Sequence, residues 1–217
     1  MNPPSIAVIY YSATGNVHQL ARAVAEGAAG AGAEVRLRRV AELAPGYAID
    51  TNPAWRAHLE ETKNTIEEAK VDDLDWADGF AFGTPTRFGT VSAQLKQFLD
   101  QTGPLWMAGK LSDKAATSFT SAINRHGGQE STLLSFNNVF YHWGAVIVPP
   151  GYTDPLLCAA GGNPYGTSFI AGMQGDRPGQ EILAAARYQG RRHAEVAGHL
   201  QEFRRGRQQW PATAAHS

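Results

Sequence analysis

The feature that most constrains this sequence is a short polar turn, residues 12–16 (Ser-Ala-Thr-Gly-Asn), placed between an apolar run and a helical pattern. Residues 5–11 form a nearly continuous apolar run, which is typical of a strand buried on both faces. Residues 17–28 repeat apolar side chains at helical spacing. The turn is therefore expected to join a buried strand to the start of a helix.

A helix start of this kind suits a phosphate group. Its first N–H groups are unpaired, the helix dipole places positive charge there, and Gly15 lets the backbone approach a ligand closely. The turn lacks the lysine of a triphosphate-binding loop and the spaced glycines of a dinucleotide fingerprint. An ordinary helix-capping turn would have the same composition, so that alternative stays open.

Length, charge and cysteine content bound the class of protein. The 217 residues show no linker, so we expect one domain over residues 1–204 and a disordered tail over 205–217. The net charge of -1 gives no general attraction to nucleic acid or acidic membranes. Cys158 is the single cysteine, and neither a signal peptide nor a membrane-length apolar stretch is evident. We therefore expect a cytoplasmic protein without membrane insertion.

Strand and helix patterns alternate along the rest of the chain. Further strands are expected at 34–40, 78–84, 114–120 and 145–149, and further helices at 53–69, 91–102, 130–141 and 180–204. The charged residues between 60 and 70 are interpreted as a solvated helix face, and Gly103-Pro104 as a helix stop. Residues 150–179 form a long segment rich in Gly and Pro, which is uncommon unless it is functional or packs against something.

This alternation predicts an α/β fold, a flavodoxin-like three-layer sandwich with a five-stranded parallel sheet of order 2-1-3-4-5. Such sheets bind ligands beyond the carboxyl ends of their strands, where the winding direction reverses. The loops that follow strands one, three and four are expected to meet there. These loops are residues 12–16, 85–89 and 121–129, and their convergence predicts one shared site.

The second and third loops carry the other candidate groups. Residues 85–89 offer backbone N–H groups, the Arg87 cation and the Phe88 ring, which suit a planar, electron-accepting ligand. A helix-capping turn with Arg87 in solvent is the alternative. Residues 121–129 carry two glycines near their end. They could contact the other side of a ligand, or form a flexible surface loop.

Several isolated residues are candidates for a functional role, but each also has a plain structural interpretation or lacks a supporting motif. His142 is either a structural hydrogen-bonding residue or a catalyst, and Trp106 is either a stacking surface for an aromatic substrate or part of the core. His193 and His199 are expected on the surface, without a metal site. Cys158 has no motif around it, and no Gly-x-Ser-x-Gly nucleophile elbow is present.

The loops resemble those of the WrbA family, the flavodoxin-like FMN-dependent NAD(P)H:quinone oxidoreductases. The resemblance covers about residues 5–200, and its most specific string is residues 82–89 (Phe-Gly-Thr-Pro-Thr-Arg-Phe-Gly). Other matching strings lie at 8–12, 21–28, 98–103, 105–106, 127–130, 146–149, 164–166 and 186–190. The resemblance implies a homotetramer, a dimer of dimers, with sites where subunits meet.

The resemblance also implies roles for individual residues. The FMN phosphate would be held by Ser12, Ala13, Thr14, Gly15, Asn16 and Val17. The flavin ring would contact Pro85, Thr86, Arg87, Phe88 and Gly89 on one side, and Ser121, Ala122, Ile123, Asn124, Arg125, His126 and Gly127 on the other. His142 of a neighbouring subunit would contact the flavin, and Trp106 would lie on the substrate side.

The sequence departs from the family pattern at two places. The family commonly has an aromatic residue where Thr14 stands, near the nicotinamide site. Residues 122–127 replace the family's Thr-Gly-Thr-Gly-Gly run and are one residue longer. Both departures bear on nicotinamide and FMN binding rather than on the fold.

The resulting hypothesis is two-electron reduction of quinones to hydroquinones. NADH or NADPH gives a hydride to FMN and leaves, and a quinone then enters the same pocket; the sequence does not distinguish the two nicotinamides. The three loops contain no acidic residue, and four candidate cations lie near the site: Arg87, Arg125, His126 and His142. This charge distribution favours a fully reduced flavin, and hence an enzyme.

Three alternatives remain at this stage. A one-electron flavodoxin-type carrier is disfavoured by the near-neutral charge and the long segment at 150–179. A non-catalytic partner of a transcription regulator is suggested by the family's association with the tryptophan repressor, but no basic groove or recognition helix supports it. A flavin-dependent azo or nitro reductase cannot be separated from a quinone reductase by sequence.

Overall fold

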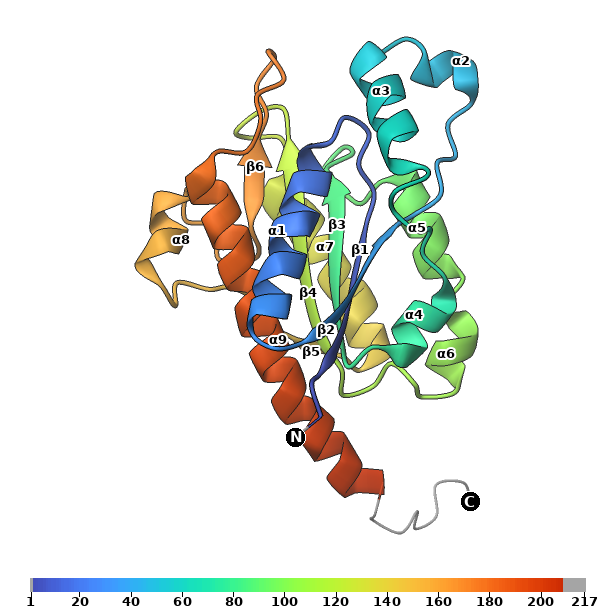
Figure 1. The fold of residues 1–217 in the computed structure, drawn as a ribbon, viewed down its shortest axis with the longest axis vertical. Helices are drawn as coiled ribbons and strands as arrows, with labels where there is room; N and C mark the ends of the chain where they lie inside the picture. The colour runs from blue at the N-terminus through green and yellow to red at the C-terminus, as the bar shows by residue number, and fades with distance from the viewer. Residues whose placement is uncertain (1, 209–217) are drawn as a thin grey trace.

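The alternating pattern folds into a parallel sheet covered by helices on both faces, in a computed structural model that describes residues 2–208 (Figure 1). The strand order is β2-β1-β3-β4-β5, and every paired strand is parallel to its neighbour. In that order the strands are Glu34–Arg39, Ser5–Tyr10, Gly79–Pro85, Ala115–Ala122 and Val146–Ile147. The flavodoxin-like order 2-1-3-4-5 is confirmed, and β2 lies at the sheet edge as its alternation predicts.

A sixth strand lies in the segment at 150–179 and was not predicted. After the short helix α8 (Pro155–Ala159), β6 (Ser168–Ile170) pairs parallel with the carboxyl end of β4. The strand β5 pairs only with the first residues of β4, so two short strands share that edge of the sheet. Three residues are too few to give a strand pattern, which is why the sequence did not reveal β6.

Two groups of helices bury the two faces of the sheet. One face packs against α1 (Asn16–Gly30) and α9 (Gln180–Gln208). The other face packs against α4 (Val71–Trp76), α5 (Ala93–Asp100), α6 (Gly103–Met107) and α7 (Gln129–Trp143). Among residues 2–208, no helix has the length and apolar character needed to cross a membrane.

The helices α1 and α9 approach each other at backbone distance. A Cβ atom added at Gly27 would lie 1.9 Å from the Arg187 carbonyl oxygen, and one added at Gly190 would lie 2.0 Å from that of Val24. These two glycines therefore set the spacing of the pair, because no side chain fits between the helices there. The close packing places the first turns of α9 beside the exposed face of α1.

The helix predicted at 53–69 is shorter in the structure. The observed helix is α3 (Pro53–Thr62), and the single-turn helix α2 (Gly46–Ile49) precedes it. The chain then runs along β2, where Arg39 N–H donates to the Glu67 carbonyl and Ala69 N–H to the Arg39 carbonyl. The Glu67 and Glu68 carboxylates form ion pairs with Arg38 and Arg39, so this part of the charged run is not a helix face. These tertiary bonds to β2 override the local helical pattern.

The ends of three predicted elements also differ. The residues Gly103 and Pro104 begin α6 rather than only ending α5, which stops at Asp100. The predicted strand at 145–149 is reduced to two residues. The helix α9 continues to Gln208, so residues 205–208 are helical and not disordered, while residues 209–217 lie outside the described part of the chain.

The surface prediction was wrong for His193 and right for His199. His193 is completely buried where α9 packs on the sheet, and neither ring nitrogen has a hydrogen-bond partner among the described residues. A Cβ atom at Gly79 would lie 2.8 Å from its Nε2 atom, so the missing side chain at Gly79 makes room for the ring. Burial lowers the pKa of His193 to about 3, so the ring is neutral at neutral pH.

Candidate functional site

A cavity of about 620 Å³ lies at the carboxyl ends of β1, β3 and β4. We call it the strand-end cavity. All three predicted loops line it, through Ser12, Ala13, Thr14, Asn16, Val17, Pro85, Thr86, Arg87, Phe88, Ser121, Ala122, Ile123, Asn124 and Gly127. The parallel order of the strands brings these loops together, because the chain leaves each strand at the same edge of the sheet.

The first loop presents a row of free amide groups. Gly15 has a φ of 98°, a left-handed conformation that most side chains avoid, and its N–H donates to Ser12 Oγ at 3.1 Å. Four other backbone N–H groups here have no acceptor among residues 2–208. They belong to Ala13, Thr14, Asn16 and Val17. Unpaired donors at a helix start are a binding site for a phosphate group.

The second loop is a tight hairpin turn. The backbone groups of Arg87 and Thr90 exchange two hydrogen bonds of 2.9 and 3.1 Å across Phe88 and Gly89, which both have positive φ. This geometry projects the Phe88 ring fully into solvent at the rim of the strand-end cavity. The turn is anchored to the first turn of α7, because the Thr132 hydroxyl donates to Thr86 Oγ1 at 2.7 Å.

The third loop contributes fewer side chains than predicted. Ser121 and Ala122 belong to the end of β4, while Gln129 Nε2 and Gly127 N–H both donate to the Asn124 carbonyl. Arg125 and His126 are exposed and do not line the strand-end cavity. Arg125 instead lines a separate cavity beside α8 and β6.

Within one chain, the described residues bring only part of the predicted positive charge to the strand-end cavity. Of the four candidate cations, only Arg87 lines the strand-end cavity; Arg125, His126 and His142 do not. Among residues 2–208, no Asp or Glu lines it either. A positive field at the cavity consequently rests on Arg87 and on the unpaired amide groups of the first loop.

Sequence reasoning missed part of the wall. Ala171, which follows β6, and the start of α3, through Thr51, Asn52 and Trp55, also line the strand-end cavity. The Asn52-Pro53 pair is a recognisable helix start, and the Asn52 side chain accepts from Ala54 N–H at 3.0 Å. Nothing local indicates that this helix start folds back over the strand ends.

A half-buried carboxylate holds Trp55 in place. Trp55 Nε1 donates to Glu42 Oε2 at 2.9 Å, the Tyr11 hydroxyl donates to the same oxygen at 2.8 Å, and Gln94 Nε2 donates to Oε1 at 2.8 Å. Burial by itself would raise the pKa of Glu42, but hydrogen bonds from Ala44 N–H and these side chains outweigh it and lower the pKa. Glu42 thus remains ionised and ties α3 to β1 and α5.

Trp106 and His142 lie at the opposite end of the sheet. The helix α7 starts beside the strand-end cavity and runs back, so that its last turn and α6 both reach the amino ends of the strands (Figure 1). Trp106 Nε1 donates to the His142 carbonyl at 2.7 Å, and both residues are exposed beside Met107 and Tyr141. Within one chain they do not line the strand-end cavity.

The groups around the strand-end cavity fit FMN. The free amide row of the first loop suits a phosphate, and Thr86, Arg87, Ile123 and Asn124 offer two neutral or cationic walls for a planar ring. The described residues hold no cluster of three His, Cys, Asp or Glu side chains able to bind a metal ion. The fold and this site define the class of flavodoxin-like flavoproteins.

Comparisons with known proteins identify the family. The model of the NADPH-dependent FMN reductase family matches residues 4–153, and the chain belongs to this family. A relative from Deinococcus radiodurans, named NAD(P)H dehydrogenase (quinone), is 44% identical over 202 residues, covering 91% of this chain and 98% of the relative. A relative of the same name from Geobacter sulfurreducens is 46% identical over 208 residues, covering 90% and 98%.

Solved structures agree on the fold. A flavodoxin-type, WrbA-like protein from Agrobacterium tumefaciens superposes with a TM-score of 0.64 and 26% identity, covering 90% of this chain and 98% of that chain. A flavodoxin from the domain Archaea superposes with a TM-score of 0.58 and 16% identity, covering 91% and 99%.

Proposed function

We propose that the protein is an FMN-dependent NAD(P)H:quinone oxidoreductase that reduces quinones to hydroquinones by two electrons. The observation that carries this proposal is the strand-end cavity, which joins a free amide row to two ring-binding walls without any acidic side chain. The relatives named NAD(P)H dehydrogenase (quinone) support the nicotinamide and quinone substrates. The match to the FMN reductase family supports the cofactor.

When bound, FMN supplies the redox chemistry that links the nicotinamide to the quinone. The residues of this chain bind and orient the cofactor and the substrates. The amide groups of residues 12–17 hold the phosphate, and Arg87 holds positive charge beside the ring. Trp55, supported by Glu42, closes the cavity on the side of α3.

A homotetramer, a dimer of dimers, completes this proposal. The exposed patch of Trp106, Met107, Tyr141 and His142 lies on α6 and the last turn of α7, and none of these residues lines the strand-end cavity of its own chain. A neighbouring copy can bring this patch over the cavity, with His142 on the flavin and Trp106 on the substrate side. Large exposed apolar patches commonly mark such contacts. A cytoplasmic location is part of the same proposal.

An anaerobic absorbance titration tests the activity. We expect NADH or NADPH to bleach the flavin band of the FMN-loaded protein directly, and benzoquinone to restore it. A flavin-free sample is the control for direct reaction between the two substrates. Bleaching by a chemical reductant but by neither nicotinamide would favour an electron carrier. Failure to bind FMN would reject the proposal as a whole.

Substitution of Trp106 tests the shared site. We expect Trp106→Ala to lower kcat/KM for quinone roughly tenfold, because truncation of a central interface aromatic commonly costs more than 1 kcal/mol. Phe203→Ala, which removes an exposed aromatic of α9, is the control. A wild-type protein that sediments as an active monomer would overturn the shared site and leave the flavin chemistry standing.

A further inference from the structure

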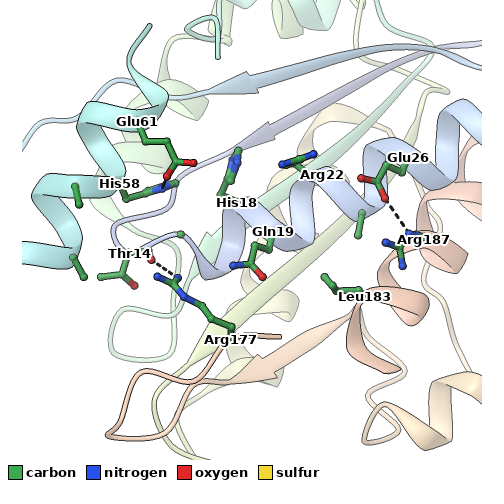
Figure 2. Close-up of a pocket in the computed structure, with 14 residues that line it drawn as sticks. Thr14, His18, Gln19, Arg22, Glu26, His58, Glu61, Arg177, Leu183 and Arg187 are labelled. Atoms are coloured by element: carbon green, nitrogen blue, oxygen red, sulfur yellow. Dashed lines mark hydrogen bonds and ion pairs between the residues drawn. The ribbon is translucent and has the colours of Figure 1, made fainter. Parts of the chain in front are cut away.

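A second cavity, of about 490 Å³, lies on the outer side of the first loop. It runs along the exposed face of α1 between α3 and the start of α9, and we call it the α1 groove (Figure 2). His18, Arg22 and Glu26 line it from α1, His58 from α3, and Arg177 from the segment before α9. Thr14 is the one residue that lines both this groove and the strand-end cavity.

Two guanidinium groups in the α1 groove have no carboxylate partner. Arg22 makes no hydrogen bond or ion pair within the described part of the chain, and it is exposed. Arg177 donates only to neutral oxygens, the Thr14 carbonyl at 2.5 Å and Asn16 Oδ1 at 3.1 Å. By contrast, Arg187 is neutralised by Glu26 at 3.0 Å at the far end of the groove (Figure 2). Although the Glu61 carboxylate also lines the groove, three arginines against two glutamates leave a net positive charge that favours an anion.

Two neutral rings and small apolar side chains form the rest of the wall. The His18 and His58 ring centroids are 5.3 Å apart, and His18 Nδ1 lies 2.5 Å from the Tyr10 hydroxyl. Burial lowers the pKa of His18 to about 4 and also lowers the pKa of His58, so both rings are uncharged at neutral pH. Ala54, Ala57 and Leu183 add apolar surface. Such a wall suits a flat heterocyclic base.

The shape of the α1 groove matches a ligand longer than a simple anion. The lining residues extend along α1 from its N-cap, Gly15, to Glu26, which corresponds to about 16 Å at 1.5 Å per residue. Free cations, flat neutral rings and the carboxylate of Glu61 lie along this length. An elongated ligand that combines a base, hydroxyl groups and a phosphate would use all three.

We propose that the α1 groove binds an adenosine phosphate, with its phosphate drawn to the Arg22 and Arg177 guanidinium groups. This group has three sources: the adenylate half of FAD, the adenosine phosphate half of NADPH, which NADH shares apart from the 2′-phosphate, and a free nucleotide. FAD is a natural source because the groove meets the strand-end cavity at Thr14, beside the turn that suits the flavin phosphate. The FAD and NADPH sources rest on the proposed function, whereas the groove as a binding site does not.

Calorimetric titration of the FMN-loaded protein with 5′-AMP tests the site directly. We expect one AMP per chain, and at least about tenfold weaker binding of adenosine and of inorganic phosphate alone. Arg22→Glu is expected to weaken AMP binding by about tenfold or more. Lys96→Glu makes the same charge change at an exposed position of α5, on the other face of the sheet, and should leave binding unchanged.

Two outcomes would overturn the proposal: no AMP binding up to about 10 mM, or equal AMP affinity in the wild type and Arg22→Glu. Arg22→Gln is the second variant, with a smaller expected loss, should the charge reversal disturb folding. Since Arg22 is exposed and unpaired, thermal midpoints of both variants should match that of the wild type.

Two further measurements distinguish the sources. If the group belongs to FAD, Arg22→Glu lowers the affinity of the flavin-free protein for FAD but not for FMN. If it belongs to a nicotinamide, the variant raises KM for NADH and NADPH alike when Arg22 binds the shared 5′-phosphate, and for NADPH alone when Arg22 binds the 2′-phosphate. If neither changes while AMP binding is lost, the ligand is a free nucleotide. Intact AMP binding in a protein that neither nicotinamide reduces would reject the proposed function and retain this site.

Discussion

The strand-end cavity and the α1 groove share Thr14, yet they present positive charge by different means. The strand-end cavity uses backbone N–H groups held by the turn at Gly15, and Arg87 is its single charged lining residue. The α1 groove presents its positive charge on exposed side chains, those of Arg22 and Arg177. Amide groups held by the fold select the shape of a phosphate, whereas exposed guanidinium groups attract negative charge over a longer range.

The two regions also differ in which part of the sequence provides their lining residues. Nearly all residues of the strand-end cavity lie within the span of the family match, residues 4–153. The α1 groove depends on Arg177, Leu183 and Arg187, which follow that span. The family match therefore covers nearly the whole strand-end cavity, whereas one wall of the α1 groove is built by residues beyond it.

The largest expected effect comes from Gly15→Val, which breaks both regions at their shared turn. A β-branched residue at a φ of 98° costs about 1–3 kcal/mol in strain, and its Cβ would lie 3.0 Å from Arg177 Nη1. We expect FMN affinity, measured by fluorescence titration of the flavin-free protein, to fall by about two orders of magnitude. Gly32→Val imposes similar strain where no atom lies within 4 Å, and should spare FMN binding. Unchanged FMN affinity in Gly15→Val would remove this turn as the phosphate site.

A smaller effect is expected from Arg87→Ala, which acts on the strand-end cavity alone. Loss of the lining cation should weaken flavin binding or slow hydride transfer by about tenfold, while AMP binding in the α1 groove stays unchanged. Stopped-flow reduction by NADH and a flavin titration measure the two effects. Arg125→Ala is the matched control, because Arg125 does not line the cavity. Equal behaviour of the two variants would show that Arg87 faces solvent without a role.

A higher salt concentration should weaken ligand binding in the two regions to different extents, and the difference should be smaller than the effects above. The guanidinium groups of the α1 groove are exposed, so their attraction for a phosphate is screened over a Debye length of about 8–10 Å near physiological salt. Raising NaCl from about 20 to 200 mM should weaken AMP binding several-fold and FMN binding less than about twofold. Parallel calorimetric titrations measure both. Equal salt dependence would contradict the contrast between backbone and side-chain recognition.

The smallest expected effect is on stability in acid. The folded protein holds His18 with a pKa of about 4, below its ordinary 6.5, so the unfolded chain takes up the proton first as pH falls. The stability from the neutral ring is therefore present above pH 6.5 and is lost as pH falls toward 4. His18→Gln removes this titration, so its urea midpoint should change less between about pH 7.5 and 5 than that of the wild type.

His193 provides the comparison for that experiment. Its lowered pKa has the same sign, but its ring is fully buried in the core, away from the α1 groove. His193→Leu should therefore flatten the pH dependence of the urea midpoint more than His18→Gln does. The reverse order would mean that acid acts mainly at the α1 groove.

Local patterns in the sequence were sufficient for the sheet and for most of the strand-end cavity. The apolar run before residue 12 and the turn at Gly15 each depend on neighbouring residues, whereas the hairpin form of the loop at Phe88 and Gly89 was not predicted. Alternation of strands and helices then limits the possible topologies, because parallel strands need right-handed crossovers. The order of β1 to β5 was predictable for that reason, although β6 was too short to detect.

The remaining features depend on contacts between distant residues. Arg177 reaches Thr14 across 163 positions, Trp55 is placed by Glu42, and His193 enters the core opposite Gly79. The sequence by itself determined the parallel sheet and the loops at its carboxyl end, since strand, helix and turn preferences act over a few residues. Only the tertiary structure decided the α1 groove, the burial of His193 and the distant position of Trp106 and His142. Those features arise when helices pack on the sheet, and no local pattern records which surfaces will meet.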